Sequence, residues 1–192
     1  MEEPTFGIDE SNDDLCNSII SRFGNSTDES HQHLCAVIGA MSQELKDNNK
    51  PCTPFAYFCA ARLSLDKFTA ESNPSSYIID ALLTVLSLAV PRVPRALLKK
   101  ESLQGHPLSE SLLRVLRSPS ASESAIAPGL KCLSHLLIAK ESVDWSDVSP
   151  LFNVLLGFLT DSRPKVHIHL SILNLTQEYF IGIPVKVFGI IT

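Results

Sequence analysis

The sequence predicts an all-α protein built from stacked helical hairpins. Apolar residues recur at helical spacing in nearly every segment before Val166, and the loops between those segments are mostly short. The first helices of the expected hairpins begin near Asp28, Ser75, Leu108 and Val148, at intervals of 47, 33 and 40 residues. Short loops favour antiparallel helix pairs, and pairs that repeat along a chain form a solenoid.

The first two expected helices lie before residue 50. Apolar spacing predicts a helix over residues 15–23, after a polar run. Ser26 to Glu29 has the pattern of a capping box, in which the serine caps the first turn and the glutamate side chain accepts a hydrogen bond from the serine's backbone amide. The helix that follows has an apolar face and ends between residues 46 and 50; the face consists of Leu34, Val37, Ile38, Met41 and Leu45.

The middle of the chain contains the most hydrophobic helix. Thr53-Pro54 predicts a helix that runs to about Lys67, because threonine is a good cap and proline suits the first helical position. A second start at Ser75 opens a helix that reaches Val90. Apolar residues on most faces of this helix indicate burial between neighbours. Two prolines end it, Pro91 and Pro94.

The remaining expected helices cover residues 95–100, 109–117, 122–140 and 151–160. We expect Pro128 and Gly129 to bend the long third one near its middle, because proline removes a backbone hydrogen bond there. Loops, turns and one tryptophan-containing connection separate these segments. The helical pattern therefore continues to about residue 160.

The turn after residue 160 is typical of one repeat class. A leucine-rich helix is followed by Asp161, a few polar residues, then Pro164 and Val166. The aspartate caps the incoming helix and the proline occupies its first turn, as in HEAT hairpins. The intervals between hairpins bracket the ~40–47 residues of such repeats. We therefore expect an irregular HEAT-like helical-hairpin solenoid fragment; the alternative is a globular helical bundle with similar spacing.

Charge is distributed unevenly along the chain. Residues 1–50 carry ten acidic and three basic side chains, whereas residues 51–192 carry eleven acidic and thirteen basic ones. This asymmetry argues against broad coating by nucleic acid, which needs a basic surface. The first residues lack the features of a secretory signal, so the five cysteines are expected to be free thiols in a reducing compartment.

Candidate chemical motifs are weak. His31, His33 and Cys35 resemble a metal cluster, but a helix places His33 on a different face from the other two, so a surface histidine pair beside a core cysteine is favoured. His167 and His169 would supply only two metal ligands, which are too few for a metal site. Two chance S-x-x-K matches, at residues 64–67 and 162–165, show how unspecific that nucleophile pattern is. We expect no enzymatic activity, no metal and no cofactor.

The densest basic segment is PRVPRALLKK, at residues 91–100. It is a candidate contact for RNA phosphates or for an acidic partner, and two arginines farther along extend it. The favoured alternative is a solvated helix end, where cations suit the helix dipole and base-stacking aromatics are absent. The candidate contact residues are Arg92, Arg95, Lys99, Lys100, Arg114 and Arg117.

Longer stretches carry a resemblance to a known family. HLCAVIGAMSQELKD at residues 33–47 and the segment 129–166 resemble the N-terminal region of the plant members of the ribosomal RNA-processing protein 12 family, and residues 77–93 and 111–118 fit the same region. The resemblance implies a nuclear and nucleolar scaffold for pre-ribosomal RNA processing and for ribosomal subunit assembly or export. It implies pre-ribosomal proteins and RNA as partners, and neither a membrane nor a small-molecule substrate.

The end of the chain departs from that family. We expect a disordered acidic segment over residues 1–12, the HEAT-like region over 13–166 and a divergent apolar tail over 167–192. The simplest hypothesis is a truncated gene product or splice form that diverges after Val166. The alternative function is a freestanding protein-interaction module, importin-like or regulatory, that binds a basic client.

Overall fold

The computed structural model describes residues 14–71, 75–102, 108–118 and 121–139, together with residues 149, 153, 154, 157 and 158. Within these residues the chain is all-helical, with seven α-helices, one 3₁₀ helix and no strand. The all-α prediction is therefore confirmed. The elements are α1 (Leu15–Phe23), α2 (Glu29–Asp47), α3 (Pro54–Ala70), α4 (Ser76–Ala89), η1 (Val90–Arg92), α5 (Arg95–Ser102), α6 (Leu108–Leu116) and α7 (Glu123–Ala139).

Two of the expected helix starts are confirmed at the level of single hydrogen bonds. The Thr53 side chain accepts a 3.2 Å bond from the Ala56 amide, and Pro54 occupies the first position of α3. Asp14 caps α1 in the same way, because its carboxylate accepts a 3.0 Å bond from the Cys16 amide. Each side chain satisfies one of the amides that the first helical turn leaves without a partner.

The start of α2 differs from the expected capping box. Asp28, not Ser26, is the cap, and its carboxylate accepts a 2.8 Å bond from the Ser30 amide. Because the helix begins at Glu29, Ser26 lies too far upstream to reach the first-turn amides. Its hydroxyl instead accepts from the Asp28 amide and pairs with Nδ1 of His31 at 2.8 Å.

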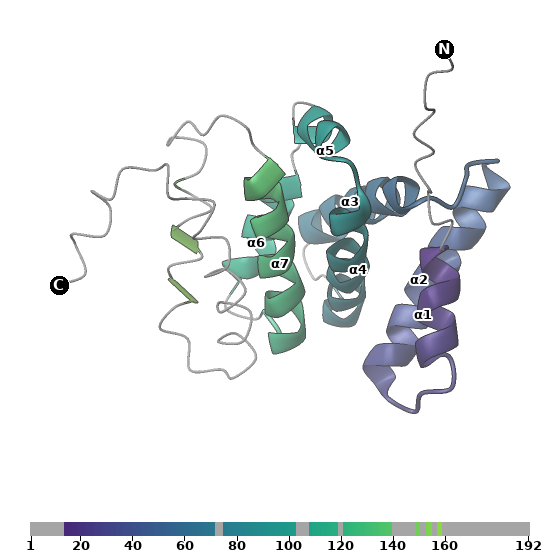
Figure 1. Ribbon diagram of the computed structural model, residues 1–192. Helices are drawn as coiled ribbons and strands as arrows, with labels where there is room; N and C mark the ends of the chain where they lie inside the picture. The colour runs from purple at the N-terminus through teal and green to yellow at the C-terminus, as the bar shows by residue number, and fades with distance from the viewer. Residues whose placement is uncertain are drawn as a thin grey trace, which may run out of the picture.

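The first two hairpins pair differently from the prediction, whereas the third begins with α6 at Leu108 as predicted. The main pairs are α1 with α2, α3 with α4, and α6 with α7, and the second helices α2, α4 and α7 pack side by side across the molecule (Figure 1). Asp28 and Ser75 therefore precede second helices, not first ones. Short helix α5 packs against α7 and lies between two hairpins in sequence, which lengthens one repeat.

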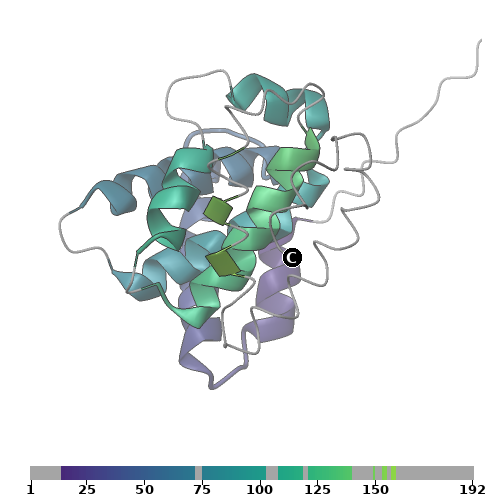
Figure 2. The ribbon, with the colours of Figure 1, turned by 90° about the vertical axis from the view of Figure 1, so that its left-hand side faces the viewer.

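Helix α4 is the centre of the core, as its apolar composition predicts. It packs against α2, α3 and α7, and Leu83, Val85 and Leu86 are fully buried. In Figure 2, which is turned by 90° about the vertical axis, the hairpin of α6 and α7 lies in front of the earlier helices. Buried side chains from α1 through α7 form one continuous cluster, so the hairpins share a core. Apolar burial of this kind is the main favourable term in folding.

The end of α4 agrees with prediction. Helix α4 ends at Ala89, and η1 contains Pro91 before the chain turns into α5. Pro128 lies inside α7 and next to Gly129, where a Cβ atom would approach the Leu116 side chain to 3.0 Å. The glycine therefore permits close packing of α7 on α6.

The last expected elements fall mostly outside the described residues. Residues 149, 153, 154 and 157 are helical, and Phe158 is buried against the core. The turn from Asp161 to Val166 and the tail 167–192, with His167 and His169, lie beyond the described part, as does the segment 1–12.

Candidate functional site

The predicted basic residues occupy two separate regions. Arg92 ends η1, Arg95 begins α5 and Lys99 follows one turn later, all with exposed side chains. Lys100 also belongs to α5, and its side chain lies outside the described part. We call these residues the basic corner. It lies at the C-terminal end of α4.

Arg114 and Arg117 lie at the opposite end of α4. Arg114 on α6 donates a 3.0 Å hydrogen bond to the Thr69 hydroxyl, near the end of α3, and lines a small cavity with Ser76 at the start of α4. Helix α4 has 14 residues, a length of roughly 21 Å at 1.5 Å per residue. The structure therefore does not bring all six predicted residues into one patch.

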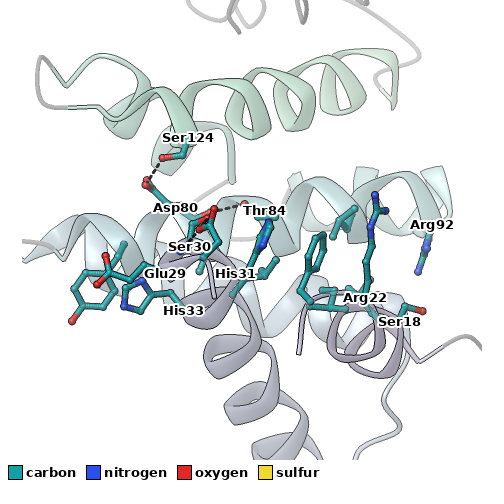
Figure 3. A pocket seen from close by; sticks show the side chains of 18 residues that line it. Ser18, Arg22, Glu29, Ser30, His31, His33, Asp80, Thr84, Arg92 and Ser124 are labelled. Carbon is teal, nitrogen blue, oxygen red and sulfur yellow. Dashed lines mark hydrogen bonds between the residues drawn. The ribbon is translucent and has the colours of Figure 1, made fainter. Parts of the chain in front are cut away.

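A larger groove runs beside α4, between it and the pair formed by α1 and α2 (Figure 3). Its volume is about 780 Å³, within the range of ligand and peptide pockets. The sequence alone did not indicate this groove, because its walls come from five segments. The residues that line it include Leu15, Ile19, Arg22, Phe23, Asp28, Glu29, His31, His33, Leu34, Tyr77, Asp80, Ala81, Thr84, Leu88 and Arg92.

Both histidines of the candidate metal motif line the groove. The ring of His31 stacks on Phe23 with 4.3 Å between centroids, and the ring of His33 stacks on Tyr77 at 4.4 Å. In the part of the chain that the structure describes, no group of three or more metal-ligating side chains is close enough to hold an ion. The arrangement fits aromatic packing at a binding surface.

The two ends of the groove carry opposite charge. Arg22 and Arg92 lie at one end, whereas Glu29 and Asp80 lie at the other (Figure 3). The Arg22 guanidinium is 5.2 Å from the centre of the Phe23 ring, a cation–π distance. Hydrogen bonds from Ser30 lower the pKa of Asp28, the neighbouring cap, so this end stays anionic near neutrality.

Asp80 also fixes the wall of the groove. Its two carboxylate oxygens accept 2.7 Å hydrogen bonds from the hydroxyls of Ser122 and Ser124, which precede or begin α7. Ser122 in turn accepts a 3.0 Å bond from the Ala125 amide and so caps α7. One carboxylate thus connects α4 to the start of α7.

The buried nucleophilic groups are unsuited to catalysis. Burial raises the pKa of the Cys132 thiol to about 12, and burial likewise raises the pKa of Cys16. A thiol with a raised pKa stays protonated, whereas the thiolate is the reactive form. Burial also raises the pKa of Tyr57, whose hydroxyl donates a 2.8 Å hydrogen bond to Asp14 and so joins α3 to the cap of α1. These groups stabilise the fold.

None of the helices in the described residues is long and apolar enough to cross a membrane. What the described surface offers is a charged groove, a basic corner and packed helix faces. Together with the stacked hairpins, these features define a protein of the helical-repeat class.

Comparison with known proteins places the chain in a family. The profile of the family "RRP12-like, N-terminal HEAT repeats" matches residues 1–171. The chain belongs to this RRP12-like family of HEAT-repeat proteins. The HEAT-like prediction is therefore confirmed.

Two curated relatives carry the name "RRP12-like protein". The chicken (Gallus gallus) protein is 29% identical over 153 residues, and the human (Homo sapiens) protein is 26% identical over 153 residues. Each alignment covers 78% of this chain and 11% of the relative. No solved structure matches the chain significantly. The narrower resemblance to plant members and the divergence after Val166 stay predictions.

Proposed function

We propose that this chain is a non-enzymatic helical scaffold that acts as part of a nucleolar factor for pre-ribosomal RNA processing and ribosomal subunit assembly or export. The observation that carries the proposal is the match of residues 1–171 to the N-terminal HEAT repeats of RRP12-like proteins. The family's function comes to this chain by similarity, because the aligned region is 11% of each relative. HEAT-repeat proteins are scaffolds built to present extended binding surfaces.

The scaffold acts by holding partners in place. Its continuous core keeps the hairpins in fixed order, and the exposed side chains on that core supply the contacts. The basic corner contributes exposed cations in Arg92, Arg95 and Lys99, with Lys100 next in sequence. Cations attract RNA phosphates and acidic protein segments alike. Arg114 and Arg117 would form a second, separate contact at the far end of α4.

Affinity purification tests the proposal. A tagged form of the 192-residue chain, expressed in cells, should localise to the nucleolus and recover pre-ribosomal RNA together with ribosome-assembly proteins. Recovery of cytosolic, non-ribosomal proteins alone would contradict it. Charge reversal at Arg92 and Arg95 should reduce RNA recovery and make the remainder more sensitive to salt, because fewer phosphates are neutralised.

A second function is a freestanding interaction module, importin-like or regulatory, that binds a basic client. The acidic balance of residues 1–50, with ten acidic and three basic side chains, favours this alternative. Purified chain would then bind lysine- and arginine-rich peptides in a salt-sensitive way and recover no RNA from cells. The same purification therefore separates the two functions.

A further inference from the structure

The groove follows one face of α4 along its whole length. Tyr77, Ala81, Thr84 and Leu88 succeed one another at intervals of three or four residues, and Arg92 continues the row beyond the helix end. Residues at this spacing share a helix face. The row spans about 22 Å at the helical rise of 1.5 Å per residue, which is the length of a helix of about fifteen residues.

The apolar side chains that the groove exposes come from both walls. Phe23 of α1 and Leu88 of α4 are half-buried and line the groove above the buried Leu15 and Ile19. Tyr77 is 51% exposed although it is large and stacked on His33. An apolar strip with polar residues around it is typical of protein-interaction sites. An amphipathic helix that lays its apolar face in such a strip is a recurring mode of recognition.

Charge gives the groove a direction. Arg22 and Arg92, both exposed, have no carboxylate partner among the described residues. The opposite end presents the exposed carboxylates of Asp28 and Glu29, with Asp80 next to them. Helices are stabilised by acidic residues in their first turn and basic residues in their last turn. A helix of that common type complements the groove only when it runs antiparallel to α4.

The same charge pattern disfavours nucleic acid in the groove. Proteins that bind single strands combine a continuous cationic channel with stacking aromatics. Here phosphates that contacted Arg22 and Arg92 would continue toward Glu29 and Asp80, where like charges repel. Arg95 and Lys99 of the basic corner do not line the groove and have no such obstacle.

We propose that the groove between α4 and the α1–α2 pair binds an amphipathic helix of a protein partner, with acidic residues in its first turn at Arg22 and Arg92 and basic residues in its last turn at Glu29 and Asp80. This site goes beyond the proposed function and depends only on the groove. Failure of the helix to bind would therefore leave the pre-ribosomal role untouched, and the reverse also holds.

Two synthetic peptides test the site. Each has about fifteen residues, the length given by the helical rise over the groove, and carries leucines at positions spaced three and four apart. The forward peptide has glutamates in its first turn and lysines in its last turn, and the all-lysine peptide has lysines in both turns, so that in either orientation one of its ends meets the arginines. Fluorescence anisotropy with the 192-residue chain should give about tenfold tighter binding for the forward peptide, as two charge pairs of modest strength would produce.

Charge reversal in the protein should invert this preference. In the Arg22→Glu/Arg92→Glu variant both ends of the groove are acidic, so the forward peptide should lose its advantage and the all-lysine peptide should bind better. The matched control is Lys50→Glu/Lys67→Glu, two exposed lysines outside the groove, which should keep the forward preference. Circular dichroism verifies that each variant is folded.

Three outcomes would overturn the proposal. These are absence of binding by both peptides, equal affinity for both, or an unchanged preference in the Arg22→Glu/Arg92→Glu variant. Binding of a single-stranded RNA oligonucleotide that Arg22→Glu alone abolishes, while neither peptide binds, would assign the groove to nucleic acid instead.

Discussion

At the scale of single residues, the termini of the helices depend on a few polar side chains. The clearest case is the end of α2, where Asn49 has a φ of 52° in the left-handed region. The Lys50 amide donates to the Leu45 carbonyl at 2.8 Å, and the Asn49 amide donates to the Lys46 carbonyl at 2.9 Å. This pair of bonds is a Schellman motif, which usually contains glycine at the left-handed position and tolerates asparagine.

Asn49→Ala should destabilise the protein by about 1 kcal/mol, because a Cβ-bearing residue without a local polar side chain is strained at positive φ. Asn49→Gly is the matched control and should be at least as stable as the parent chain. Urea unfolding followed by circular dichroism measures both. Equal loss of stability in the two variants would show that the asparagine side chain matters and the backbone conformation does not.

His135 on α7 gives the stability a pH dependence. Burial lowers its pKa below the ordinary value of 6.5, and the neighbouring charge of Lys131 lowers it further. The unfolded chain therefore takes up a proton before the folded chain does as the pH falls through 6.5. The stability that depends on a neutral His135 is fully present above pH 6.5. It is lost progressively below that pH, until the pH passes the pKa of His135 in the folded chain.

His135→Gln should remove that contribution. Stability of the parent chain should fall between about pH 7.5 and about pH 5.5, on either side of the ordinary histidine pKa, and should fall less in the variant. Urea midpoints at both pH values provide the measurement. If the difference between the two midpoints is the same in both proteins, His135 is not the group responsible.

At the scale of secondary-structure elements, side-chain bonds between helices determine which hairpins are joined. Asp80 accepts hydrogen bonds from the hydroxyls of Ser122 and Ser124. Ser111 on α6 donates a 3.0 Å hydrogen bond to Asp66 on α3. Ser122 and Ser124 lie at the start of α7, where backbone groups also need partners. These hydrogen bonds fix the position of α6 and α7 relative to α3 and α4, and thereby one wall of the groove.

Asp80→Ala should lower the free energy of unfolding by about 2 kcal/mol, since hydrogen bonds to a charged group are worth about 1.5–3 kcal/mol and two hydroxyls lose their acceptor. Asp47→Ala is the control, because Asp47 accepts only a local bond from Gln43 on the same exposed face of α2. Thermal unfolding of both variants tests this. A loss no larger than that of the control would mean that α7 does not depend on Asp80.

Local patterns predicted the helices better than their partners. Thr53-Pro54 predicted the start of α3, and the apolar run predicted the burial of α4. Both features depend on residues close together in sequence, and both predictions are confirmed. The pairing of α4 with α3 depends on contacts distant in sequence, which periodicity does not contain. The groove was missed for the same reason, because Arg22 and Asp80 line one groove only through the packing of α2 on α4. An indirect signal was the row from Tyr77 to Arg92.

At the scale of the whole molecule, one core joins the three hairpins of the described residues. Leu86 of α4 is 0% exposed and belongs to the cluster that extends from α1 to α7. A short repeat array with a continuous core is expected to unfold in a single transition, because neighbouring repeats stabilise each other. The order of hairpins, and therefore every surface on them, is maintained by this core.

Leu86→Ala should destabilise the protein by about 2–5 kcal/mol, the cost of removing a buried leucine side chain and leaving a cavity. Leu63→Ala on α3 is the matched control, because Leu63 is 61% exposed and should change stability little. Both variants should still unfold in one transition by circular dichroism. Two separate transitions in the parent chain would show that the hairpins do not share a cooperative core.

The proposed function requires that this helical-repeat scaffold associate with pre-ribosomal particles. Sucrose-gradient sedimentation of nuclear extract that contains the tagged chain measures this association. The chain should sediment with particles that contain pre-ribosomal RNA, and ribonuclease or the Leu86→Ala substitution should shift it to the top of the gradient. Sedimentation of the folded parent chain at the top of the gradient, free of precursor RNA, would contradict the proposed function.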